Sequence, residues 1–116
     1  MSTGALEAIE RILNRGGDAD DVLREVVATL VERGGCAWAG IVFHESGELL
    51  LGPEAGTPQP AARTQLPVVF QGDHVAELVA DGCDDRAFLE RVATIVSPYC
   101  LVGWDTSGVQ WDALGG

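Results

Sequence analysis

The apolar positions of the chain follow a helical period near its start and a strand-like pattern further on. Apolar side chains recur at helical spacing over about residues 4–15 and again over about 19–33, which predicts two amphipathic helices. Paired glycines follow each stretch, and glycine often ends helices because it adopts the left-handed backbone conformation at little cost. Residues 36–43 then form an unbroken apolar run, which predicts a strand that is covered on both faces.

Two hairpins separated by a loop are predicted in the middle of the chain. Apolar runs on either side of a glycine-containing turn predict one hairpin over about residues 36–51 and another over about 64–80. The stretch between them, residues 52–63, is rich in proline and glycine and is predicted to be a loop. A domain linker is the alternative, but neither half of a 116-residue chain would bury a core of its own.

A third helix and a tail complete the predicted elements. An apolar stripe predicts the helix over about residues 84–97, and Pro98 is expected to end or kink it because proline lacks a backbone N–H. The tail, residues 101–116, contains Trp104 and Trp111. Two large aromatic side chains favour a tail that folds back or packs on a partner.

Length and charge restrict the kinds of partner that the chain can bind. The 116 residues suit a single domain, 1–116, and the hydrophobic content of 47% is typical of a globular chain. The formal net charge is −11, and the basic residues are all arginine. Because such a surface repels phosphate groups, neither nucleic acid nor an anionic membrane is expected as a partner. An acidic face for a basic protein is an alternative to a purely solubilising role.

The start of the chain and the cysteines indicate the compartment. The first residues lack the basic segment and the apolar stretch of a secretory signal. No apolar run approaches the roughly 20 residues that a membrane helix requires. The 3 cysteines agree with a reducing compartment, and their odd number leaves at least one thiol unpaired within the chain. A cytoplasmic location is therefore expected.

The cysteines offer one weak catalytic candidate. Cys36 and Cys100 lie in predicted apolar elements and are expected to be small buried hydrophobic side chains. Cys83 stands at the N-terminus of the third predicted helix, where the helix dipole favours a thiolate. Neighbouring acids, Asp81 and Asp85 among them, disfavour the thiolate because their negative charges repel it. No catalytic residue is therefore assigned beyond this weak candidate.

The two histidines stand at the edges of the predicted hairpin turns. Together with Cys83 or Asp73, His44 and His74 could hold a metal ion, since these residue types are common metal ligands. Solvated surface histidines are the simpler interpretation. We therefore predict neither a metal site nor a cofactor.

One arginine lies at the end of the predicted loop. Arg63 stands where residues 52–63 enter the second hairpin. It is expected to pair with one of the many acids, and binding of an anionic ligand is the alternative. A pocket between the sheet and this loop would make Trp38, Arg63 and His44 the ligand-binding candidates.

The order of these elements and several short patterns resemble GAF domains. Trp38–Phe43 followed by Gly47–Pro53 resembles the first hairpin of that family. Leu66–Leu78 resembles the closing hairpin, and Asp85–Ala93 is similar to the terminal helix. The resemblance covers about residues 6–99 and rests on the order of the hydrophobic patterns, since no single motif in it is specific.

The resemblance implies an α+β fold of the GAF/PAS type. The sheet would be antiparallel with strand order 2-1-4-3, and the helices would pack on one of its faces. The second face would then need a cover, for which the candidates are the loop, the tail with Trp111 or another copy of the chain. GAF domains usually carry a longer segment with its own helix over the ligand pocket, and only residues 52–63 occupy that place here. The cyclic-nucleotide, tetrapyrrole and small-molecule binding of the family is therefore not carried over.

Three functions are compatible with the sequence. The leading hypothesis is a non-catalytic GAF-like sensor or assembly module that acts as a homodimer through its first and third helices, as dimeric GAF domains do through their terminal helices. The second is a small-molecule binding protein with a pocket between the sheet and residues 52–63. The third is a thiol-dependent enzyme similar to the free methionine sulfoxide reductases, although no cysteine here matches their catalytic positions.

Overall fold

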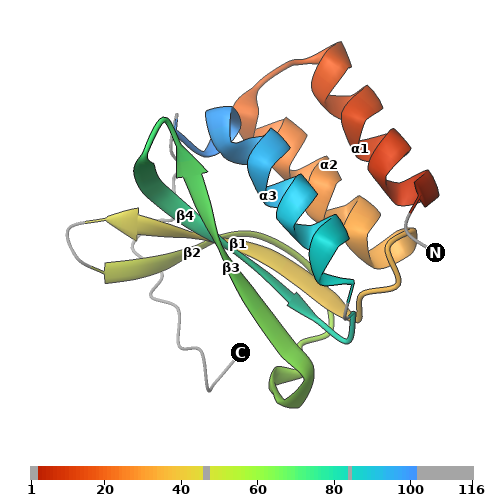
Figure 1. The fold of residues 1–116 in the computed structure, drawn as a ribbon. Coiled ribbons are helices and arrows are strands. Elements are labelled where there is room, and N and C mark those ends of the chain that lie inside the picture. Colours follow the sequence, from red (N-terminus) through yellow and green to blue (C-terminus); the bar gives the residue numbers. More distant parts are fainter. Residues whose placement is uncertain (1–2, 46–47, 84, 102–116) are drawn as a thin grey trace.

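Three helices and a four-stranded sheet make up the described part of the chain (Figure 1). The computed structural model describes residues 3–45, 48–83 and 85–101. The helices are α1 (Thr3–Arg15), α2 (Ala19–Glu32) and α3 (Arg86–Leu101), with a short 3-10 helix, η1, at Pro60–Ala62. The strands are β1 (Trp38–Glu45), β2 (Glu48–Gly56), β3 (Arg63–Phe70) and β4 (Asp73–Asp81).

The sheet is antiparallel, and its strand order β2-β1-β4-β3 confirms the predicted order. The strands β1 and β4 are therefore central, and β2 and β3 are the edges. Ile41 of β1 pairs with Leu78 of β4, which pairs in turn with Leu66 of β3. This register places a row of large apolar side chains across the sheet on the face that the helices cover.

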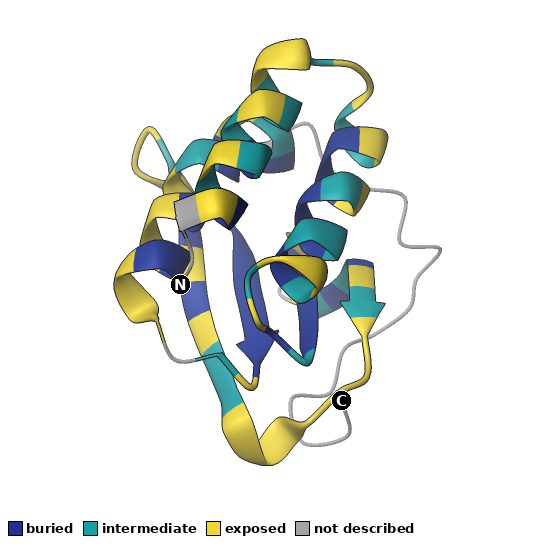
Figure 2. Cartoon of the chain, turned by 90° about the vertical axis from the view of Figure 1, so that its right-hand side faces the viewer, coloured by how far each residue is buried: buried dark blue, intermediate teal, exposed yellow. Residues whose placement is uncertain are grey.

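The helices cover this one face in two layers (Figure 1). α2 packs across β1 and β2, α3 packs across β3 and β4, and α1 lies on α2 and α3. Figure 2 shows buried residues on the inner sides of the helices and exposed residues on their outer turns. The largest fully buried aliphatic side chains of this core are Ile9, Leu23, Leu30, Ile41, Leu66, Leu78 and Leu89.

The other face of the sheet carries a second, smaller apolar cluster. Trp38, Val42 and Val79 are fully buried there, and Leu49 and Leu51 pack beside them. Side chains alternate between the two faces along a strand, so the intervening residues of β1 join the main core. The prediction of a first strand that is covered on both faces is thereby confirmed.

The second strand is longer than predicted. β2 continues to Gly56, so its connection to β3 consists of residues 57–59 and η1 instead of a loop over 52–63. The pairing of β1 with β2 shifts between Gly40 and Val42, which leaves one extra residue in β2. Proline is tolerated at such bulges and on edge strands. Pro53 therefore lies inside β2 without ending it.

The third helix also continues past its predicted end. α3 runs through Pro98 to Leu101 instead of stopping near residue 97. Proline removes the backbone N–H that would bond the carbonyl oxygen of Thr94. The hydroxyl of Ser97 donates a hydrogen bond of 2.8 Å to that oxygen instead. A side-chain donor thus replaces the missing backbone donor, and the helix continues.

Two expectations concern residues outside the described part of the chain. They are the packing of the tail with Trp104 and Trp111, and the conformation of Asp84; the third helix itself begins at Arg86, slightly later than predicted. Of the helices that the structure describes, none has the length and apolar character needed to cross a membrane.

Candidate functional site

The sheet face opposite the helices carries two groups of polar side chains, one at each end. Alternate residues of each strand point to this face. The first group, here named the arginine cluster, consists of Trp38, Glu54, Gln59, Arg63 and Asp81. The second group, here named the histidine cluster, consists of His44, Gln65, His74 and Glu77.

The centre of the arginine cluster is a row of residues from three neighbouring strands. Asp81 of β4 pairs in register with Trp38 of β1 on one side and with Arg63 of β3 on the other. The guanidinium of Arg63 donates from Nε to Oδ1 of Asp81 and from Nη2 to Oδ2, each over 2.8 Å. Its Cζ lies 5.0 Å from the ring centroid of Trp38, within the range of a cation–π contact.

This ion pair is buried. The side chain of Asp81 is 0% exposed, and that of Arg63 is 8% exposed. Burial alone would raise the pKa of Asp81, but hydrogen bonds from Arg63 and from the backbone N–H of Gln59 outweigh it and hold this pKa below its ordinary value. The hydrogen bond to Asp81 raises the pKa of Arg63. Both groups are therefore charged at neutral pH.

The indole of Trp38 is positioned by a hydrogen bond at its N–H and by close packing of its ring on Gly40. Its Nε1 donates a hydrogen bond of 3.0 Å to Oε1 of Glu54. A Cβ added at Gly40 would lie 2.6 Å from the ring, so the ring occupies the space that this glycine leaves open. The ring is thus fixed under the guanidinium of Arg63.

The arginine cluster also fastens the connection between β2 and β3. The backbone N–H of Gln59 donates to Oδ2 of Asp81 over 2.8 Å. At the end of η1, the N–H of Gly82 donates to the carbonyl oxygen of Ala62 over 3.0 Å. Asp81 therefore joins the short connection to the central strand as well as pairing with Arg63.

The three predicted ligand-binding residues do not form one site. Trp38 and Arg63 lie together, whereas His44 belongs to the histidine cluster at the opposite end of the face. Arg63 pairs with an acid, as the sequence favoured, and a ligand at this guanidinium would compete with a buried carboxylate.

The histidine cluster forms around one carboxylate. His44 Nε2 lies 2.9 Å from Oε2 of Glu77, and His74 Nε2 contacts the same oxygen. The two imidazole centroids are 4.3 Å apart. Gln65 Nε2 donates to the other oxygen of Glu77, Oε1, over 3.3 Å. Glu77 is buried, and both histidines are exposed.

Sequence reasoning missed the two acids that organise these clusters. Glu77 and Asp81 both lie on β4, whose other inner positions are apolar, and their even spacing places them on the same face of the sheet. Two acids at such spacing in a central apolar strand are the signal that was available. The metal partners considered from the sequence, Asp73 and Cys83, lie outside the histidine cluster.

Two cysteines, Cys36 and Cys83, differ from their predicted states. Cys36 and Cys83 form a disulfide, with their Cα atoms 4.7 Å apart, so neither is the unpaired side chain that the sequence suggested. The physical reason is the register of the central strands, because Trp38 pairs with Asp81 and each cysteine lies two residues beyond. Cys83 is a disulfide sulfur here and not a thiolate nucleophile. Cys100 is free and buried as predicted, and burial raises its pKa to about 12.

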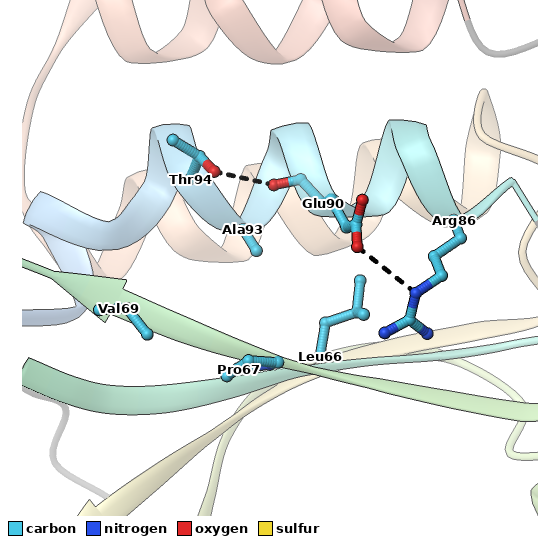
Figure 3. Close-up of a pocket in the computed structure, with 7 residues that line it drawn as sticks. All are labelled: Leu66, Pro67, Val69, Arg86, Glu90, Ala93 and Thr94. Carbon is cyan, nitrogen blue, oxygen red and sulfur yellow. Dashed lines mark hydrogen bonds and ion pairs between the residues drawn. The ribbon is translucent and has the colours of Figure 1, made fainter. Parts of the chain in front are cut away.

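A groove of about 340 Å³ lies between α3 and the edge strand β3 (Figure 3). Arg86 and Glu90 of α3 form an ion pair of 3.4 Å on its helix side. Leu66 and Val69 line the strand side, and Val69 is 46% exposed. None of the residues predicted to bind a ligand lines this groove.

Solved structures with a similar fold include GAF domains and GAF-fold enzymes. The GAF domain of a phosphoenolpyruvate-protein phosphotransferase from Coxiella burnetii is similar over 85% of this chain and 92% of that chain, with 13% identity and a TM-score of 0.73. A putative GAF sensor protein from Burkholderia vietnamiensis covers 83% of this chain and 90% of its own, at 17% identity and a TM-score of 0.71. The free methionine-R-sulfoxide reductase of Neisseria meningitidis is similar over 84% of this chain and 86% of its own chain, at 18% identity and a TM-score of 0.69.

These identities are low, and neither a protein family model nor a curated protein sequence matches the chain. The likeness therefore concerns the fold and not the activity. The strand order and the helices on one face agree with it and with the resemblance seen in the sequence. The chain thus has a GAF-like fold.

Proposed function

We propose that this chain is a non-catalytic GAF-like sensor or assembly module that acts as a homodimer through α1 and α3. The observation that carries the proposal is a series of apolar side chains along these helices that the core buries only in part. They are Leu6, Ile12 and Leu13 of α1 and Ile95 and Tyr99 of α3. Covering such a surface with a second copy would remove further apolar area from water, which favours association.

The two helices present a fixed surface to a partner. The hydroxyl of Tyr99 donates a hydrogen bond of 3.0 Å to the carbonyl oxygen of Leu13, and Arg91 forms an ion pair of 3.6 Å with Glu10. A shallow cavity of about 340 Å³ between α1 and α3 is lined by Leu13 and Ile95 among others. Because the two helices are already joined, little ordering would be needed on association.

The charges of α1 favour a second copy as the partner. Glu7 lies in the first half of the helix, and Arg11 lies in the second. A two-fold axis across α1 would pair the helix with itself in the antiparallel direction. Glu7 of one protomer would then face Arg11 of the other, and the interface would be complementary to itself.

The alternatives have less support from the described residues. A thiol enzyme would first require reduction of the disulfide that holds Cys83, and Cys100 is buried. A ligand pocket at Trp38 and Arg63 would have to displace side chains that pack on each other and on Asp81.

A charge-exchange experiment tests the dimer. Light scattering coupled to size exclusion should give a dimer for the wild type at micromolar concentration. Glu7→Arg and Arg11→Glu should each weaken the dimer by about tenfold or more, because like charges would face each other across the axis. The double variant E7R/R11E should recover most of the affinity, since it restores opposite charges.

Asp73→Arg is the matched control, because it changes the charge by the same amount as Glu7→Arg at the exposed first residue of β4. It should leave the dimer unchanged. A wild-type monomer at micromolar concentration would refute the proposal. A double variant as weak as the single ones would refute this interface while leaving another dimer interface open.

A further inference from the structure

We infer that the histidine cluster is a zinc-binding site with His44, His74 and Glu77 as its protein ligands. Each side chain offers one ligand atom, and these atoms all lie within 4.8 Å of one another. Two imidazole nitrogens and one carboxylate oxygen are a common ligand set for Zn²⁺. The site lies apart from the surface proposed for dimerisation and does not depend on it.

The geometry needs only small movements to hold the ion. Zinc–ligand distances of about 2.0–2.1 Å place neighbouring ligand atoms of a tetrahedral site about 3.3 Å apart. His44 Nε2 already lies 2.9 Å from Oε2 of Glu77, and His74 Nε2 contacts the same oxygen. The histidine side chains are 36% and 45% exposed, so both imidazoles can rotate slightly to admit the ion. The fourth ligand would be water.

A bulge in β4 brings His74 to this face. His74 and Glu77 are three residues apart, and in a regular strand such residues point to opposite faces. The pairing of β3 with β4 shifts between Val68 and Val69, because Val68 pairs with Ala76 and Val69 pairs with His74. The extra residue is Val75, which packs on the helix side with the main core. The bulge therefore turns His74 toward Glu77, and bulges often redirect side chains at functional sites.

The carboxylate is held in place by a neighbouring strand. Gln65 of β3 donates to Oε1 of Glu77, which leaves Oε2 directed at the imidazoles. The side chain of Glu77 is 9% exposed, so its position is largely fixed by packing. Hydrogen bonds of this kind to a ligating carboxylate orient it and are part of many metal sites.

The charge balance also favours a divalent cation. With neutral imidazoles the three ligands carry a charge of −1, and the chain as a whole carries −11. A strongly negative protein concentrates cations near its surface. The alternative is a pair of hydrogen bonds from the histidines to Glu77 with no metal, and a binding experiment separates the two cases.

The test is titration of the metal-free full chain with Zn²⁺ in a calorimeter, with Co²⁺ as a spectroscopic substitute. We expect one ion per chain, a visible absorption band of bound Co²⁺ typical of four-coordinate sites, and a melting temperature that rises with Zn²⁺ concentration. The imidazole signals of both histidines should shift together in NMR spectra.

Variants assign the ligands. His44→Asn, His74→Asn and Glu77→Gln should each weaken Zn²⁺ binding strongly, and H44N/H74N should abolish it. Gln65→Ala should weaken it by about 10–100-fold, as expected for a residue that orients a ligand. Asp73→Asn is the matched control next to His74 and should bind Zn²⁺ like the wild type.

Circular dichroism without metal shows whether each variant is folded. The inference fails if the wild type shows no saturable binding of one Zn²⁺ per chain. It also fails if folded H44N/H74N binds Zn²⁺ as tightly as the wild type.

Discussion

The guanidinium of Arg63 donates two hydrogen bonds of 2.8 Å each to the carboxylate of Asp81. The two residues are cross-strand partners on β3 and β4, and the carboxylate is fully buried. Such a bidentate pair is both stronger and more directional than a single charged hydrogen bond. Because the same carboxylate accepts the backbone N–H of Gln59, the pair determines how β3 enters the sheet.

Removing the arginine should destabilise the protein strongly. Arg63→Met keeps much of the side-chain volume but leaves the buried carboxylate of Asp81 without its charged partner. Breaking a buried pair in this way costs about 3–5 kcal/mol of the free energy of unfolding. Urea unfolding followed by circular dichroism measures this loss.

The double variant R63M/D81L is the control, because it removes both charges and leaves only the backbone N–H of Gln59 without its acceptor. It should be closer to the wild type than Arg63→Met is, since replacing both members of a buried pair by apolar groups is often nearly neutral. A double variant less stable than the single one would contradict this account.

The stability contributed by Asp81 should depend on pH. The pKa of this carboxyl is lower in the folded than in the unfolded chain, so the unfolded chain takes up the proton more readily. The contribution is therefore fully present above the unfolded pKa of about 3.9 and is lost as pH falls through the folded value. We expect the difference in the free energy of unfolding between wild type and Asp81→Asn to shrink below about pH 4. A difference that stays constant from neutral to strongly acidic pH would contradict the assignment.

Reduction of the disulfide should lower the stability of the fold. Cys36 and Cys83 are separated by 47 positions in sequence, so their bond closes a long loop in the unfolded chain. The loop-entropy model gives about 4 kcal/mol for a loop of this length, and measured effects are often smaller. Thermal unfolding with and without dithiothreitol measures the difference.

C36A/C83A supplies the control for this experiment. Its melting temperature should not change on adding dithiothreitol, because the free thiol of Cys100 is not part of a disulfide. If reduction lowers the melting temperature of this variant as much as that of the wild type, the disulfide is not the cause.

Local patterns in the sequence identified the elements and left their exact ends open. The predicted helix over 19–33 is α2, and the pairs of apolar runs are the two hairpins. The predicted ends were wrong at two prolines, where neighbouring groups offset the energetic cost of placing proline inside a strand or a helix. Pro53 lies in the edge strand β2 near a bulge, and the missing donor at Pro98 is replaced by the hydroxyl of Ser97. Such compensation depends on neighbouring groups, so residue preferences alone do not predict it.

The composition of the arginine cluster and the histidine cluster depends on strand register, which a single sequence does not determine. The GAF resemblance placed β1 beside β4, and the pairing of these two strands brings Cys36 next to Cys83. Trp38 and Arg63 were selected together as members of one ligand pocket, but the structure brings them together through Asp81, which was not selected as a site residue. His74 meets Glu77 only because a bulge changes the direction of its side chain.

The replacement of the missing donor at Pro98 can be measured by a double-mutant cycle. Ser97→Ala should leave the carbonyl oxygen of Thr94 without a donor and cost about 1–3 kcal/mol of the free energy of unfolding, since Ser97 is buried. In the Pro98→Ala background the backbone N–H of residue 98 can bond this oxygen, so the same substitution should cost less. Urea unfolding of the four proteins gives the coupling energy, which we expect to be about 1 kcal/mol. Equal costs in both backgrounds would show that the hydroxyl of Ser97 does not substitute for the donor that proline lacks.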